Sequence, residues 1–199
     1  MFKQLKKESF YYAAPVILMT TKDPITNIDN ITAISSSWTL GKSVVLGIGL
    51  VNQGYINLSA GSDLTLNLAD ETSYESVLKI SRATGNSEIA DWKKALNYSY
   101  STDKFSLGHF TKMDGQTVSS ARIKECPIQL ECKMIHMTER KEIAIVECDI
   151  KNILVDESIL HDDRHIDVNK WQPLIYKFRA YTSTGKAFAK DSRFLEFSD

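Results

Sequence analysis

The sequence has few cysteines, no long hydrophobic run and almost no net charge. Cys126, Cys132 and Cys148 show no CxxC spacing, so we expect no structural disulfide and interpret them as small core residues. No segment approaches the roughly 20 apolar residues that span a bilayer, and the basic N-terminus lacks the apolar core of a signal peptide. A net charge of −1 gives no reason to expect a nucleic-acid partner. We therefore expect a soluble, cytoplasmic protein with neither nucleic acid nor membrane as a partner.

The motifs of common nucleotide-binding and hydrolytic enzymes are also absent, namely GxGxxG, GxxxxGK[ST] and GxSxG. His161 and His165 have the spacing of a metal-binding pair, but their segment is charged and has no apolar face, so we predict a solvated turn and no metal site. Asp70 and Glu71 are expected to cap the next helix rather than to form an acid–base couple. The sequence therefore predicts no catalytic side chain of its own.

The periodicity of the apolar residues changes twice along the chain. Strand patterns cover residues 14–21, 31–39, 43–51 and 64–69, helical patterns cover 73–83 and 87–96, and strand patterns return at 127–137, 142–155 and 173–182. Residues 98–118 are aperiodic and predict a long loop of a length that is usually functional. This order favours a mainly β fold with inserted helices, α+β or barrel, over a Rossmann fold. The length favours a single domain, residues 1–199, with a helical insertion at about 71–97.

One of the strand patterns, NITAISSSWTLG at residues 30–41, is unusually polar. It places an amide and several hydroxyls where a strand would usually bury valine or isoleucine. Short donors that converge from a fixed backbone suit a planar polar heterocycle or a phosphate. Serine and threonine are also common on an exposed strand face, and the residues by themselves leave both interpretations open.

An ordered set of segments resembles the flavin reductase-like family, whose domain is an FMN-binding split β-barrel. These segments are PVILMTTKDPITNIDNITAISSSWTLG, VVLGIGLVNQGYINLSAGSDLTLNLADE, RATGNSEIADWKKALNYSY, DKF, KECPIQLEC and WQPLIYKFRAY. The resemblance runs from about residue 10 to residue 185. It implies a Greek-key split barrel, FMN as cofactor, NAD(P)H as co-substrate and a homodimer.

The resemblance also implies where the flavin is held. Four residues are expected at the edge of the isoalloxazine ring: Asn30, Thr32, Ala33 and Ile34. Four more are expected near the ribityl chain and phosphate: Ser35, Ser36, Ser37 and Trp38. The next turn is expected to add phosphate contacts from Asn52, Gln53, Gly54 and Tyr55. The chain departs from the family at Gly54 and Tyr55, where members often carry serine or threonine.

Further residues complete this set of expectations. Lys104 and Arg179 are candidate cations for the flavin. The aromatic residues of the 98–118 segment either cover the open face of the ring or pack on the surface: Tyr98, Tyr100, Phe105 and Phe110.

Three functions are compatible with these residues. The first is an NAD(P)H-dependent oxidoreductase that reduces FMN and passes the electrons on to a small molecule or a protein. The second is an FMN-binding electron carrier that is reduced by a protein partner and has no NAD(P)H activity of its own. The third is a split-barrel scaffold without flavin. A bound flavin brings its own redox chemistry, which fits the absence of a catalytic acid, base or nucleophile.

Overall fold

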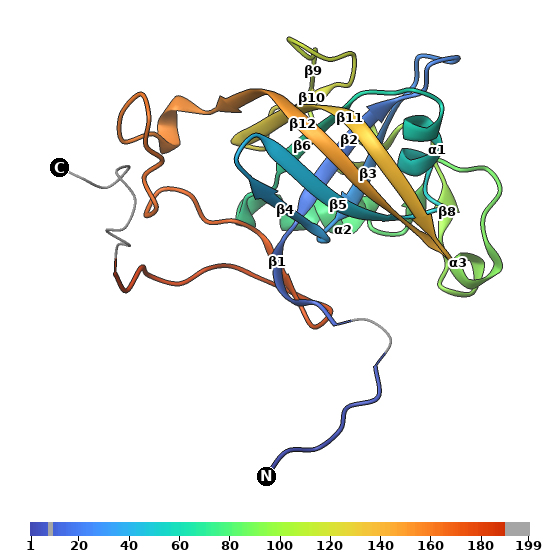
Figure 1. The fold of residues 1–199 in the computed structure, drawn as a ribbon, viewed down its shortest axis with the longest axis horizontal. Coiled ribbons are helices and arrows are strands. Elements are labelled where there is room, and N and C mark those ends of the chain that lie inside the picture. The colour runs from blue at the N-terminus through green and yellow to red at the C-terminus, as the bar shows by residue number, and fades with distance from the viewer. Residues whose placement is uncertain (8–9, 190–199) are drawn as a thin grey trace.

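A computed structural model describes residues 1–7 and 10–189. Its main element is an antiparallel sheet of seven strands in the order β3-β2-β6-β11-β12-β5-β4 (Figure 1). The strands are β2 (Ile17–Lys22), β3 (Asp29–Ile34), β4 (Ser37–Leu40), β5 (Ser43–Gly49), β6 (Leu64–Leu68), β11 (Ile128–Arg140) and β12 (Ile143–Val155). The two longest, β11 and β12, pair over their whole length with irregularities near Cys132 and His136. Such bulges bend and twist a sheet, which allows this one to curl.

The curled sheet does not close. Its edge strands, β3 and β4, are not paired with each other, yet only Ser35 and Ser36 separate them in the chain. A two-residue connection between opposite edges brings those edges close together, so the sheet forms a barrel with a gap at Ser35–Ser36. The predicted split barrel, mainly β with a few helices, is confirmed.

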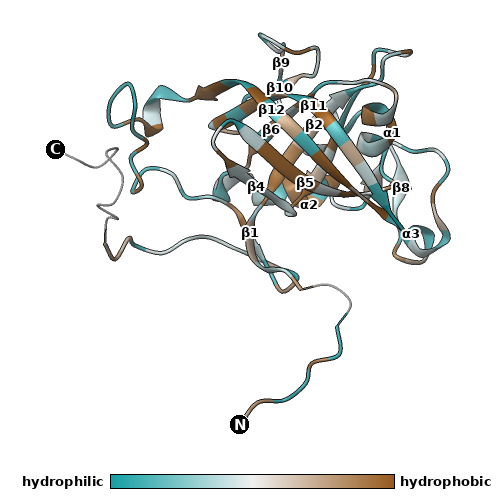
Figure 2. Ribbon diagram, viewed as in Figure 1, coloured by the Kyte–Doolittle hydropathy of each residue, from teal (hydrophilic) through white to brown (hydrophobic). Residues whose placement is uncertain are grey.

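Every second side chain along the strands points inward, and these side chains fill the barrel. On β5 the buried residues are Val44, Leu46 and Ile48, and on β12 Ala144 and Val146 lie opposite them in the same core. Figure 2 shows β5 and β12 as largely hydrophobic and the surrounding loops as mostly hydrophilic. The intervening residues of β5, among them Gly47 and Gly49, therefore face outward.

A second core lies on the outer face of β2 and β3. The helices α2 (Tyr74–Ile80) and α4 (Lys104–Gly108) contribute Val77 and Phe105 to it, packed with Leu18 and Ile31 of the strands. Because β2 is covered on both faces, it reads as a nearly continuous apolar run rather than an alternating one.

Segments near the two ends of the chain pair in a separate three-stranded sheet, here called the terminal sheet. Here β1 (Tyr12–Pro15) pairs with β13 (Ile175–Lys177), which pairs with β14 (Ala180–Thr182). The β13–β14 turn consists of Phe178 and Arg179, both with positive φ, 47° and 72°. This is the geometry of a type I′ hairpin turn, and it places Arg179 at the tip.

Shorter elements connect these layers. They are α1 (Gln53–Ser59), the 3₁₀ helices Glu71–Ser73 and Glu157–Ile159, β7 (Ala83–Thr84), α3 (Asp91–Ala95), β8 (Ser99–Tyr100), β9 (Lys112–Met113) and β10 (Arg122–Ile123). None of the described helices is long and apolar enough to cross a membrane.

Several predicted elements need correction. The strand predicted at 31–39 is two strands broken at Ser35–Ser36, and the one predicted at 173–182 is the β13–β14 hairpin. The helices predicted at 73–83 and 87–96 shrink to α2 and to the five residues of α3. The predicted loop 98–118 contains α4, and α1 was not predicted; helices of five and seven residues are too short to show a periodic apolar face.

The predicted roles of two groups of side chains are confirmed. Asp70 caps the first 3₁₀ helix, because its carboxylate accepts a hydrogen bond from the Thr72 amide at 2.8 Å. All three cysteines are buried and free. Burial raises the pKa of both Cys132 and Cys148 to about 12, so these thiols stay protonated at neutral pH.

Candidate functional site

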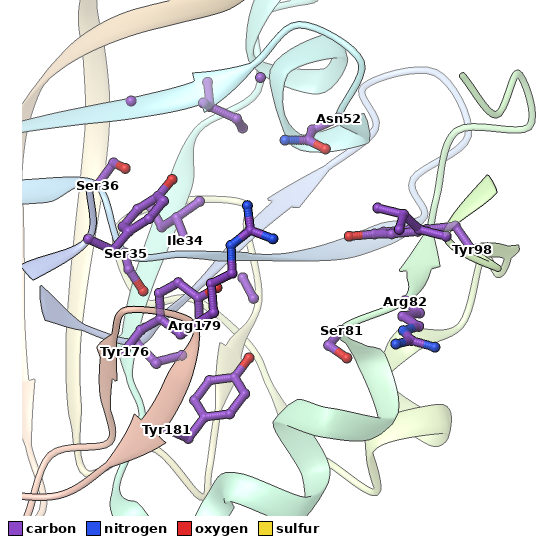
Figure 3. A pocket seen from close by; sticks show the side chains of 17 residues that line it. Ile34, Ser35, Ser36, Asn52, Ser81, Arg82, Tyr98, Tyr176, Arg179 and Tyr181 are labelled. Carbon is purple, nitrogen blue, oxygen red and sulfur yellow. The ribbon is translucent and has the colours of Figure 1, made fainter. Parts of the chain in front are cut away.

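A cleft of about 560 Å³ lies at the gap of the barrel (Figure 3). Its size is within the range of small-molecule sites. It is lined by Tyr11, Val16, Ala33, Ile34, Ser35, Ser36, Gly47, Ile48, Gly49, Asn52, Ser81, Arg82, Leu96, Tyr98, Tyr176, Arg179 and Tyr181. The lining thus comes from the barrel strands, from the segments after α2 and α3, and from the β13–β14 hairpin.

The serine connection forms one side of the cleft. The backbone oxygen of Ser36 accepts a hydrogen bond from the Gly47 amide at 2.8 Å, which ties the connection to β5. Ser36 is exposed, and Ser35 is half-buried. Within the described residues the hydroxyls of Ser35 and Ser36 have no hydrogen-bond partner. The connection therefore offers two free hydroxyls to a molecule in the cleft.

Two glycines of β5 form the adjoining wall. A Cβ atom on Gly47 would have one neighbour within 4 Å, the Cβ of Ser36 at 3.4 Å. A Cβ atom on Gly49 would lie 3.3 Å from Nδ2 of Asn52. Because neither glycine carries a side chain, the outer surface of β5 is backbone there, bordered by Ser36 and Asn52. A flat ring could therefore approach this surface closely.

The electrostatic character of the cleft is positive. Two guanidinium groups line it, those of Arg82 and Arg179, and both residues are exposed. No aspartate, glutamate or histidine is among the described residues that line it. In Figure 3 the Arg179 side chain extends from the hairpin toward the middle of the cleft. This arrangement favours an anionic ligand.

A buried lysine supports the far end of the cleft. Lys93, on α3, donates to Oδ1 of Asn52 at 2.8 Å and to the carbonyl of Val51 at 3.4 Å. Burial lowers its pKa below the ordinary value. Its ammonium lies 5.6 Å from the ring centres of Trp92 and Tyr98, within the range of cation–π attraction.

Five of the predicted site residues line the cleft together: Ala33, Ile34, Ser35, Ser36 and Asn52. Two others, Ser37 and Trp38, line an adjoining groove of about 630 Å³ between the N-terminal segment and β4–β5. The cleft and the groove share Tyr11, Ser35, Ser36 and Gly47, so they adjoin each other.

The remaining predicted residues lie elsewhere. Asn30 and Gln53 line a separate hollow of about 220 Å³. Thr32 is buried and accepts a hydrogen bond from Asn30. Gly54 is buried in α1, where a Cβ would lie 2.6 Å from Met19, so its role is close packing of helix on strand. Tyr55 donates to Glu139.

Lys104 is buried rather than exposed to the cleft. Its ammonium donates to Oδ1 of Asn30 at 3.0 Å and to the carbonyl of Ile31 at 2.7 Å. Burial, followed by repulsion from Lys93, lowers the pKa of Lys104 to about 7. It therefore fixes β3 from behind, and Phe105 and Phe110 are core residues of the same region.

Sequence reasoning missed part of the lining. Arg82 and Ser81 lie just after α2, Tyr11 directly precedes β1, and Tyr176 and Tyr181 belong to β13 and β14. These residues are distant in sequence from the serine connection, and no local pattern links them to it. Of the residues outside the main site prediction, Tyr98 and Arg179 do line the cleft.

Comparison with known proteins agrees with this architecture. The family model described as "Flavin reductase like domain" matches residues 9–185. The chain is 36% identical over 197 residues to the protein YdfE of Bacillus subtilis (strain 168), covering 96% of this chain and 94% of that protein.

Solved structures share the fold. Flavoredoxin of Desulfovibrio vulgaris (Miyazaki F) superimposes with a TM-score of 0.80 at 24% identity, covering 97% of this chain and 98% of that chain. Flavoredoxin from Methanosarcina acetivorans has a TM-score of 0.78 at 16% identity, covering 97% and 96%. Since the family model spans most of the chain, the protein belongs to the flavin reductase-like family of split-barrel proteins, which identifies it as a flavin-related oxidoreductase.

Proposed function

We propose that the protein binds FMN in the cleft at the barrel gap and reduces it with NADH or NADPH. The observation that carries the proposal is the composition of this cleft. It combines a wall of bare glycine backbone, free serine hydroxyls and a positive charge without acidic residues. These three features suit a planar ring with a phosphate tail.

The described residues suggest how the cofactor would be held. Gly47 and Gly49 would face the ring, Ser35 and Ser36 would donate hydrogen bonds to its polar atoms or ribityl chain, and Asn52 would donate to the phosphate. Arg82 and Arg179 would balance negative charge. When bound, FMN would supply the redox chemistry, which agrees with the lack of acids and bases in the lining.

The tyrosines would control access of water. Tyr98, Tyr176 and Tyr181 line the cleft and are half-buried. Tyr176 and Tyr181 pack against each other with ring centres 5.5 Å apart. A site closed by aromatic side chains limits contact of a reduced cofactor with solvent.

We also propose that two copies pair over the outer face of β4, β5 and β12. Strand register places Trp38 beside Val45 and Gly47 beside Ile145 on this face. Trp38 and Leu40 are 58% and 75% exposed. An apolar surface of this kind is typical of an interface, and it borders the groove that adjoins the cleft. Light scattering of the purified protein should give twice the chain mass, whereas the chain mass itself would contradict the pairing.

An activity assay tests the enzymatic part. Purified protein is mixed with FMN and with NADH or NADPH, and nucleotide oxidation is followed with free flavin or a ferric complex as acceptor. The proposal expects oxidation that depends on both protein and flavin. Tight FMN binding without oxidation of either nucleotide would contradict it and favour an electron carrier that a protein partner reduces.

A further inference from the structure

Lys93 occupies an unusual position for a lysine. It lies on α3, in the inserted segment between α2 and α4, and only 4% of its surface is exposed. Its neighbour Lys94 is exposed and pairs with Asp91 at 3.1 Å. The two adjacent lysines thus have opposite surroundings, which makes Lys94 a natural control for Lys93.

The ammonium of Lys93 has only uncharged partners. It donates to the Asn52 side chain and the Val51 carbonyl, and none of the ion pairs formed within the described residues includes it. A buried charge is normally paired, because removing it from water is costly. The pKa of Lys104 is lowered by burial and then by repulsion from Lys93, and among the described residues its ammonium also donates only to neutral oxygens.

The contact with Lys93 also determines how Asn52 faces the cleft. An ammonium has three donors and no acceptor, so Asn52 must present its oxygen to Lys93. The amide nitrogen Nδ2 is then directed to the other side, where it lies beside Gly49. Asn52 lines the cleft and is thereby fixed as a hydrogen-bond donor to whatever binds there.

We propose that Lys93 is the positioning residue through which this chain selects a flavin that carries a phosphate monoester over one that does not. Its charge lacks a counter-ion among the described residues, and Asn52 connects that charge to the cleft as an oriented donor. The proposal rests on the proposed function and deepens it. A dianionic phosphate near Asn52 supplies the missing negative charge, whereas riboflavin has none to offer.

The test compares FMN with riboflavin, which differ only in the phosphate. Dissociation constants of both flavins are measured by fluorescence quenching for the full-length parent and for Lys93→Met, Lys94→Met and Arg82→Gln. The parent is expected to prefer FMN. Lys93→Met should reduce that preference about tenfold or more, the loss expected for a charge-assisted hydrogen bond. Lys93→Met should bind riboflavin about as tightly as the parent does. The control Lys94→Met should bind both FMN and riboflavin as the parent does.

The possible results separate the alternatives. If Lys93→Met weakens the binding of both flavins equally, or changes neither dissociation constant, the inference is overturned, but the proposed binding of FMN in the cleft still stands. If the preference for FMN over riboflavin falls in Arg82→Gln but not in Lys93→Met, the Arg82 guanidinium recognises the phosphate and the inference about Lys93 is overturned. A parent that binds neither flavin would refute the proposed function itself, and this inference with it.

Discussion

Replacing Gly47 with alanine should affect stability and flavin binding in opposite directions. Gly47 lies within a strand and does not need positive φ, and a Cβ there would meet only the Ser36 Cβ at 3.4 Å. Alanine in place of a strand glycine stabilises by roughly 0.5–1 kcal/mol. For a chain of this length that corresponds to a rise of about 1–4 °C in Tm.

The same methyl group would project from the wall that we assign to the flavin ring. Overpacking of a fitted contact typically costs about 1–3 kcal/mol, which corresponds to a Kd for FMN about 5- to 150-fold weaker. Thermal unfolding of the apoprotein and fluorescence titration with FMN measure the two effects. Ser43→Ala, at the other end of β5 and outside the cleft, is the control. If Gly47→Ala binds FMN as tightly as the parent, the assignment of this wall to the flavin ring is refuted.

Three other substitutions test the site and its support. Ser36→Leu should weaken FMN binding by about 1–3 kcal/mol by replacing a free donor, and an unchanged Kd would contradict the role of the serine connection. Glu131→Gln should destabilise the protein by about 2–4 kcal/mol, because the buried carboxylate accepts bonds from Gln116 and Thr117; urea unfolding with the parental midpoint would exclude this. Lys104→Met should abolish a pH dependence of the free energy of unfolding. The pKa of Lys104 is lowered to about 7, so the unfolded chain binds more protons above that pH, and parental stability should rise from pH 7 to about 8.5 by up to roughly 1.4 kcal/mol per pH unit. If urea unfolding shows the same change of unfolding free energy with pH in Lys104→Met and in the parent, this expectation is refuted.

Much of the fold could be predicted from the sequence because buried and more exposed residues alternate along β5 and along the first half of β12. The break of residues 31–39 into β3 and β4 could not, because it depends on the closure of the sheet: Ser35–Ser36 must cross from one edge to the other. A serine pair in a strand pattern is compatible with either a continuous strand or such a crossing.

The site was predictable only in its local part. Ala33 to Ser36 and Asn52 lie close to the strand ends where their polarity is visible in the sequence. Lys104 was expected to bind the flavin, but tertiary packing buries it behind β3. The role of Lys93 depends on a contact across 41 residues, and the sequence holds no sign that distinguishes it from Lys94.

The most direct test of the central claim is the stoichiometry of FMN binding to the purified protein. Absorption spectra recorded before and after incubation with FMN and removal of free flavin measure it. The proposed site predicts the visible bands of bound flavin at one FMN per chain, and a loss of those bands in Ser36→Leu. A parent protein that remains colourless after incubation would contradict the claim that the cleft at the barrel gap binds FMN.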